Sequence, residues 1–315
     1  MENDYGKGIV LVLISALFWA VMGPIAKFIV ADNVSLMTAM IFRGLFVFVV
    51  FLLWYLIKSP KELLNYTKDE IIFYSLSAVL SVAFAGGGYF MSLEYMSVAE
   101  AMILHYTFPM VTIFCSSFVT HEKVSYREIT AGILILIGVY VGVGKGRNIS
   151  ELPIVGILYG IIAVIGIAGQ ALLGRKYTLK GEIYNPMKTL LVSHLIGAIL
   201  LIIYKTIFLG WDDLNNVTPE ILSWMTIQST SGSVIAYSTY FLAFRYIPAA
   251  IVSLLCSGEM IFAMLFTIIL LGVYPTHNQI LGASTILLAI AIVTVRPELL
   301  RLLKKRIVSI HKSSV

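Results

Sequence analysis

Residues 89–99 read YFMSLEYMSVA, and residues 240–250 read YFLAFRYIPAA. The two stretches align without a gap at an offset of 151 residues, with Tyr, Phe, Tyr and Ala at matching places. The same offset aligns EITAG at 128–132 with QILGA at 279–283, and an offset of 148 places Gly8 over Gly156 and Lys27 over Arg175. Because similarity at a fixed distance is the sequence sign of a repeated structural unit, we predict two related units.

The composition indicates a chain that is solvated by lipid. Apolar residues make up 59% of the 315 residues and charged residues 12%, against about 45–50% and about 25% in soluble domains. This composition excludes a disordered protein, a nucleic-acid binder and an ordinary cytosolic enzyme. The two cysteines, Cys115 and Cys256, lie inside apolar runs, so neither a disulfide framework nor a CxxC metal site is available.

Ten apolar segments reach or approach the roughly 20 residues that a helix needs to cross a bilayer. The runs are too long for strands and do not alternate. They cover residues 8–30, 36–57, 71–93, 99–119, 129–144, 154–174, 186–209, 221–243, 249–273 and 278–295. The expected fold is therefore an all-α integral membrane protein with ten transmembrane helices.

Ten helices in two related units give five helices to each unit. Because five is odd, the second unit must insert upside down, so we predict two inverted five-helix repeats, an arrangement typical of transporters. The expected boundaries are a first repeat over 1–147, a second over 148–296 and a basic cytoplasmic tail over 297–315.

The distribution of Lys and Arg predicts the orientation of the chain. If the N-terminus is inside, the inner segments and the tail hold 16 of the 22 Lys and Arg residues, and the outer segments hold 3. Positive residues favour the inner side of a membrane. We therefore expect a multi-pass protein of the cell membrane with both termini in the cytoplasm.

Three stretches resemble one family of membrane proteins. LEYMSVAEA at 93–101, FPM at 108–110 followed by Glu122-Lys123, and GILILIGV at 132–139 resemble motifs of EamA-type permeases of the drug/metabolite transporter superfamily. The resemblance implies a secondary transporter that exports small organic metabolites, such as amino acids or related solutes. The second half departs from the pattern, since Gly272-Val273 stands where Gly-Glu is usual and Glu259-Met260 where Glu-Pro often occurs.

Four ionisable residues lie well inside their predicted spans, where charge is expensive and functional by default. Glu259 is a candidate for a substrate or proton site, and an interhelical hydrogen bond is the alternative. His105 either titrates or contacts a substrate carboxylate, or else is a neutral histidine bonded to a backbone carbonyl. Arg43 and its equivalent His194 either hold an anionic substrate group or act structurally, and Arg43 has Glu259 as a possible partner.

Other charged residues are expected nearer the membrane surfaces. Glu100 is a candidate for a gate at the outer mouth. Lys27, Lys188 and Lys205 lie near helix ends, so we expect their ammonium groups to extend to the surface.

Aromatic residues form the second group of candidates. Five of them are expected to line a cavity, with ring faces for stacking and hydroxyls for hydrogen bonds, although interface belts are the common alternative. They are Trp19, Tyr89, Tyr106, Tyr237 and Tyr240. The runs Gly86–Gly88 and Ser229–Ser233 favour close helix packing or local unwinding.

Several functions lack their motifs. No Gly-Lys-Ser/Thr follows the glycine run, and no histidine or acid cluster has metal spacing, so we expect no cofactor, no metal and no enzyme. The expected partners are a small-molecule substrate, the lipid bilayer and protons as a coupling ion, with no nucleic acid, in a monomer or weak dimer. An integral-membrane enzyme and a sensor or scaffold without flux are the alternatives.

Overall fold

The computed structural model describes residues 2–96, 98–143, 154–179 and 185–294, and all of their regular structure is helical. We call residues 2–143 the first half and residues 154–294 the second half. The first half holds α1 (Glu2–Ala20), α2 (Met22–Ala31), α3 (Leu36–Lys58), the 3-10 helix η1 (Pro60–Leu64), α4 (Lys68–Ser77), the π-helix η2 (Ala78–Gly87), α5 (Gly88–Leu93), α6 (Val98–His105), α7 (Phe108–Val119) and α8 (Tyr126–Val143).

The second half repeats this order. It holds α9 (Ile154–Leu179), α10 (Pro186–Phe208), the 3-10 helix η4 (Asp212–Asn216), α11 (Pro219–Ser229), the π-helix η5 (Thr230–Ile235), α12 (Ala236–Ala243), α13 (Ala249–Cys256), α14 (Glu259–Leu271) and α15 (His277–Thr294). The bounds of α6 and α8 recur in α13 and α15 after 151 residues. The offset found in the sequence is therefore also the offset between equivalent helices.

Helix starts in the two halves are capped in the same way. Ser35 and Asn185 accept a backbone hydrogen bond at the starts of α3 and α10, and Thr67 and Thr218 do so at the starts of α4 and α11. Such side chains satisfy backbone N–H groups that a helix start leaves without partners. The capping residues are thus repeated 150 or 151 residues apart.

Seven helical segments within the described ranges are long and apolar enough to cross a membrane. They are Tyr5–Ala31, Leu36–Lys58, Lys68–Leu93, Ile154–Leu179, Pro186–Phe208, Ala249–Leu271 and His277–Thr294. The chain is therefore a multi-pass membrane protein. The predicted spans 99–119, 129–144 and 221–243 are not among the seven, so the count of ten remains a prediction.

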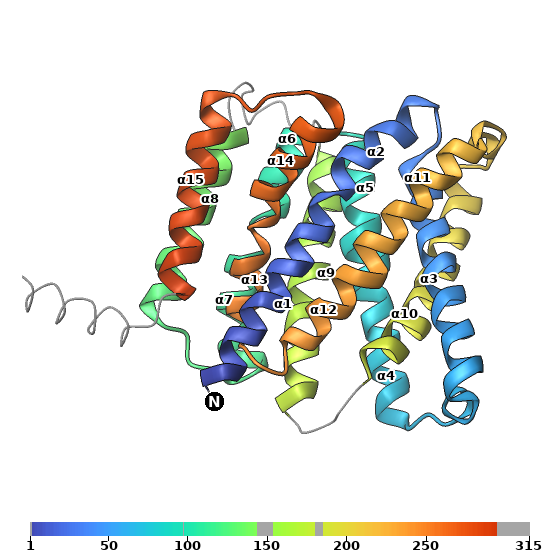
Figure 1. The fold of residues 1–315 in the computed structure, drawn as a ribbon, viewed down its shortest axis with the longest axis horizontal. Coiled ribbons are helices and arrows are strands. Elements are labelled where there is room, and N and C mark those ends of the chain that lie inside the picture. The colour runs from blue at the N-terminus through green and yellow to red at the C-terminus, as the bar shows by residue number, and fades with distance from the viewer. Residues whose placement is uncertain (1, 97, 144–153, 180–184, 295–315) are drawn as a thin grey trace, which may run out of the picture.

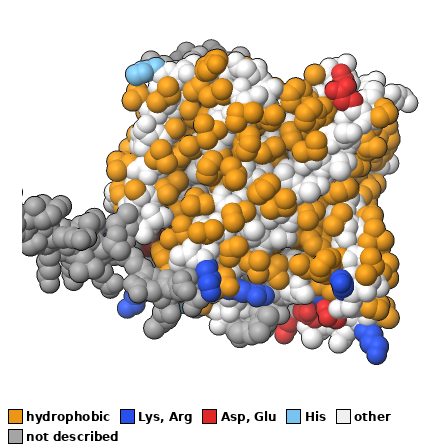
Figure 2. Space-filling view, in the orientation of Figure 1, with side chains coloured by type: hydrophobic (Ala, Val, Ile, Leu, Met, Phe, Trp, Pro, Cys, Tyr) orange, Lys and Arg blue, Asp and Glu red, His pale blue; other side chains and the backbone are white. Residues whose placement is uncertain are grey.

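The bundle has two ends and a central region (Figure 1). α8 and α15 lie side by side at one end, and α3 and α10 pack against each other at the other. The N-terminus, the α7–α8 link and the α12–α13 link lie on one face, which we call the N-terminal face. Figure 2 shows hydrophobic side chains over the middle of the bundle and Lys and Arg side chains along this face.

The prediction that Lys188 and Lys205 extend to the surface is wrong. Lys205 Nζ, in a side chain only 2% exposed, lies 2.9 Å from Asp213 Oδ1 and donates to Ser35 Oγ at 3.1 Å. Lys188 is also buried, and its Nζ donates to the Asn65 carbonyl at 2.6 Å. Both ammonium groups find partners inside the protein, so they need not reach water. Lys27 is exposed, as expected.

Three expectations fall outside the described residues. The boundaries at 147–148 and 296–297 and the basic tail over 297–315 lie there.

Candidate functional site

Trp19 is the centre of a group of aromatic rings that joins the two halves. Its ring centroid lies 5.0 Å from that of Tyr237 and 5.1 Å from that of Tyr240, and both tyrosines belong to α12. Its indole Nε1 donates to the Gly232 carbonyl at 2.8 Å, within the π-helix η5. Trp19 is 8% exposed, so this hydrogen bond satisfies the polar atom of a nearly buried ring and fixes its orientation.

A second aromatic group lies in the first half around His105. The His105 ring centroid is 4.9 Å from Tyr89 and 5.7 Å from both Tyr106 and Phe108. His105 ends α6 and Phe108 begins α7, so a break in the helix places these side chains together. His105 Nδ1 is buried and has no hydrogen-bond partner in the described part of the chain. The expected alternative, a bond from this nitrogen to a backbone carbonyl, is therefore not seen.

Glu259 connects the two aromatic groups. It interacts electrostatically with Tyr89 and Tyr106 of the first half and with Tyr237 of the second. Its side chain is half-buried and makes no hydrogen bond or ion pair with a described residue. The sequence placed Glu259 inside a continuous helix, whereas the helix breaks at Ser257–Gly258 and Glu259 is the first residue of α14. A carboxylate at this place is favoured by the partial positive charge of a helix N-terminus.

Arg43 supplies the positive charge of the site. It is 5% exposed on α3, and its Nη1 lies 3.7 Å from the sulfur of Met22. It interacts electrostatically with Tyr237 and His194. A Cβ on Gly86 would lie 3.2 Å from Arg43 Nη2, so the glycine of η2 leaves room for the guanidinium.

No acid within the described ranges forms an ion pair with Arg43, so the predicted alternative of a bond to Glu259 is not seen. A buried guanidinium without a carboxylate is costly. Such a group is suited to binding an anionic group of a ligand through two parallel N–H donors.

His194 is near this site but has its own partner. Its Nδ1 lies 3.1 Å from the Leu190 carbonyl, four residues earlier on α10, and its ring is 5.9 Å from that of Tyr237. The side chain is 2% exposed. These contacts favour the structural alternative for His194. Glu100 belongs to α6, but its side chain lies outside what the structure describes.

Sequence reasoning missed the two helix breaks, at Tyr106–Thr107 and Ser257–Gly258, and the roles of Met22 and Gly232 as neighbours of the site. Pro109 and Gly258 were the available signals for the breaks. Both small-residue runs lie at π-helices, since Gly86 and Gly87 end η2 and Thr230–Ser233 begin η5. The expected close packing is present as well, because a Cβ on Gly88 would lie 2.9 Å from the Tyr159 carbonyl.

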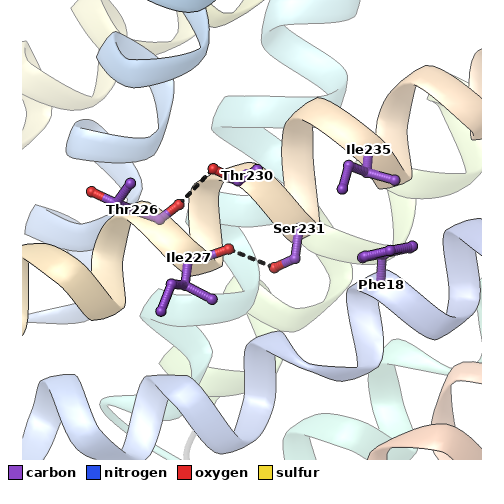
Figure 3. Close-up of a pocket in the computed structure, with 6 residues that line it drawn as sticks. All are labelled: Phe18, Thr226, Ile227, Thr230, Ser231 and Ile235. Carbon is purple, nitrogen blue, oxygen red and sulfur yellow. Dashed lines mark hydrogen bonds between the residues drawn. The ribbon is translucent and has the colours of Figure 1, made fainter.

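A separate groove of about 300 Å³ lies beside α1 and η5 (Figure 3). Figure 3 places Phe18 across from Ser231 and Ile235. The Thr230 and Ser231 hydroxyls donate to the carbonyls of Thr226 and Ile227, so they are already satisfied by their own helix. None of the predicted site residues lines this groove, which we therefore do not assign as the candidate site.

Comparison with known proteins identifies the family. The EamA-like transporter family model matches residues 6–143 and matches again at residues 154–295. The chain belongs to the EamA-like transporter family. The two matches to this family coincide with the two halves of the structure.

Two EamA-like relatives are named as transporters. The chain is 24% identical over 215 residues to the uncharacterized transporter YxxF of Bacillus subtilis, covering 66% of this chain and 65% of that protein. It is 23% identical over 309 residues to an uncharacterized transporter of Helicobacter pylori, covering 97% of this chain and 100% of that protein.

The fold also has a solved counterpart. A crystal structure aligns with a TM-score of 0.76 at 15% identity, covering 92% of this chain and 96% of the other. At this identity the match supports the fold and says nothing of the substrate. The protein is thus a membrane transporter of the EamA-like family.

Proposed function

We propose that this EamA-like transporter is a secondary transporter that moves small organic solutes by alternating access. The observation that carries the proposal is the convergence of Arg43, Glu259 and His105 with aromatic rings contributed by both halves. A central site between two related units is typical of transporters with repeated folds. In this proposal the halves are inverted five-helix repeats of a ten-helix protein in the cell membrane, with both termini cytoplasmic.

The groups at the site suit a small solute with charged ends. Arg43 would hold an anionic group, Glu259 would hold a cationic group or a proton, and the rings would contact an apolar body. Amino acids and related metabolites have this combination. We propose outward transport of such solutes, with Glu259 as the group that couples transport to protons. No carboxylate, thiol or histidine cluster suggests a different chemistry among the described residues.

The experiment is counterflow of a panel of labelled amino acids and related solutes in proteoliposomes. Glu259→Gln keeps the shape of the side chain but cannot release a proton. We expect this variant to retain counterflow and to lose the acceleration that a pH gradient gives the wild-type protein. Glu62→Gln is the matched control, because Glu62 is exposed and lies away from the site.

Two outcomes would contradict parts of this proposal. If no solute of the panel undergoes counterflow, the proposed substrate class is wrong. If Glu259→Gln transports normally from pH 5 to pH 8, Glu259 is not the coupling group, and His105 becomes the next residue to test.

A further inference from the structure

An ion pair joins the two halves at the N-terminal face. Arg175 Nε donates to Glu122 Oε1 at 2.8 Å, and Arg175 Nη2 lies 2.8 Å from the same oxygen. Arg175 Nη1 also donates to the Phe244 carbonyl at 2.6 Å. Thr120 donates to the other oxygen of Glu122 at 3.1 Å. The residue following the end of α7, the α9 helix and the end of α12 are therefore held together by one guanidinium.

The pair is well shielded for a contact at a helix end. The Arg175 side chain is 14% exposed and that of Glu122 is 19% exposed. A charge-assisted pair with two N–H groups on a carboxylate and a third on a carbonyl is stronger than an exposed ion pair. Glu122 belongs to the first half and Arg175 to the second, so separating the halves at this face requires breaking the pair.

Apolar packing is matched at the two faces of the bundle. A Cβ on Gly8 of α1 would lie 2.8 Å from Ile247 Cγ2 and 2.9 Å from Tyr246 Cβ. A Cβ on the equivalent Gly156 of α9 would lie 2.5 Å from Met96 Cγ and 3.0 Å from Tyr95 Cβ. Tyr246 and Ile247 are the residues that follow Tyr95 and Met96 by 151. The two faces thus use equivalent residues for the same close contact.

The ion pair is not matched. The equivalent of Arg175 at the opposite face is Lys27, and the equivalent of Glu122 is Val273. α2 and α14, which carry or adjoin these residues, pack against each other, as α9 and α7 do. Val273 cannot accept a proton or pair with a cation, and Lys27 is exposed without an ion pair in the described chain. A charged contact therefore closes only one of the two equivalent places.

We propose that Glu122 and Arg175 form a one-sided lock, which holds the N-terminal face shut and makes the opposite face the easier one to open. Because the apolar contacts of the two faces are equivalent, the ion pair is the difference that sets the balance between them. The lock rests on the proposed alternating-access function. It concerns the conformations of the protein without solute, so it can be tested independently of transport.

The test uses a matched pair of buried reporters in the full-length protein. Ala243→Cys reports on the N-terminal face and Ser92→Cys on the opposite face; these positions are 151 residues apart and both are 0% exposed. Cys115 and Cys256 are replaced by alanine, so that the reporter is the single thiol. The rate of modification by a water-soluble maleimide is then measured in purified, reconstituted protein without solute.

Glu122→Gln removes the charge and keeps the shape. We expect labelling at position 243 to rise by about fivefold, the lower end of typical couplings between sites, without a rise at position 92. Glu62→Gln, an acid-to-amide change elsewhere in the first half, should change neither rate. An unchanged rate at 243, or an equal rise at both reporters, would overturn the lock, since the latter indicates general loosening.

Val273→Glu tests the same idea by adding a contact. It places a carboxylate opposite Lys27, so labelling at position 92 should fall and labelling at position 243 should rise. If neither rate changes, the two faces are not balanced by this contact and the proposal is wrong. Failure of every counterflow assay would count against the transport proposal and leave the labelling result standing.

Discussion

The two halves of the molecule share a skeleton and differ in the groups that they bring to the site. α6 and α13, α7 and α14, and α8 and α15 occur at the same spacing in each half. At equivalent places, however, the first half has Arg43, His105 and Phe108, and the second has His194, Cys256 and Glu259. The backbone framework is repeated, whereas the charges are not. A solute bound between the halves therefore meets a cation from one and an acid from the other.

This difference shows which constraints the repeat imposes. Helix breaks, caps and glycine contacts determine how the chain packs, and they recur in both halves. Charged residues recur only where packing needs them, so their differences between the halves are the places to look for function. Each of the following predictions changes one residue and compares it with its counterpart in the other half.

The largest effect is expected for Asp213→Ala. Asp213 pairs with the buried Lys205 and accepts hydrogen bonds from Thr38 Oγ1 at 2.6 Å and from the Ser35 N–H at 3.0 Å. Loss of the carboxylate leaves a buried ammonium unpaired, which costs about 3–5 kcal/mol of unfolding free energy. Its counterpart Glu62 is exposed, so Glu62→Ala should change that free energy by less than about 0.5 kcal/mol. Denaturant unfolding in detergent measures both, and equal losses would contradict the comparison.

The same carboxylate gives a dependence on pH. Burial alone would raise the pKa of Asp213, but hydrogen bonds from Thr38, Lys205 and Ser35 lower it from 3.8 to about 2. A lowered pKa in the folded state stabilises the protein above the unfolded value. This part of the stability is therefore complete above about pH 4 and is lost as the pH falls to about 2. The Asp213→Ala variant should lack this part of the wild-type pH dependence.

The next effect is expected at Arg43, and it falls on binding rather than on stability. Arg43→Met removes a buried charge that lacks an acidic partner, so unfolding free energy should stay the same or rise. Affinity for an anionic or zwitterionic solute should fall by about 10- to 100-fold, the range for hydrogen bonds to charged groups. Ligand-dependent thermal shifts measure the affinity.

His194→Asn is the counterpart in the second half. Asparagine retains a polar group to bond the Leu190 carbonyl, so affinity should change by less than about twofold. If the two variants lose affinity equally, the halves contribute equally to the anion site and the comparison fails.

The smallest effect is expected for the two matched glycines. Gly8→Ala and Gly156→Ala each place a Cβ within 3.0 Å of side-chain atoms in the other half, and overpacking of this kind costs about 1–3 kcal/mol. The two losses should agree with each other. Gly23→Ala, at a position with no atom within 4 Å, is the control and should not destabilise the protein. A loss for only one of the matched pair would show that the faces are packed differently.

Much of the fold could be predicted from the sequence, because apolar length and repeated residues leave a direct signal. The run at 278–295 corresponds to α15, and the run at 129–144 corresponds to most of α8. The break before Glu259 could not be predicted in this way, since an apolar run has the same hydropathy whether its helix is continuous or divided.

The site was less predictable than the fold. The ionisable and aromatic candidates could be chosen by their depth in apolar runs, and Glu259 does lie near Tyr89 and Tyr237. The partners of the candidates could not be chosen, because they are far away in the sequence. Lys205 shows the difficulty: its contact with Ser35 spans 170 residues, and without that contact a lysine near a helix end is expected to reach water.

The two buried lysines of α10 have a mechanical consequence. α10 belongs to the second half, yet Lys188 attaches one of its ends to the Asn65 carbonyl and to Glu70, whose Oε1 lies 3.6 Å away, and Lys205 attaches the other end to Ser35. A beam fixed at both ends does not pivot against its support. α3 and α10 therefore act as a stator that is built from both halves, and the moving part of the transporter is a rotor made of the remaining helices.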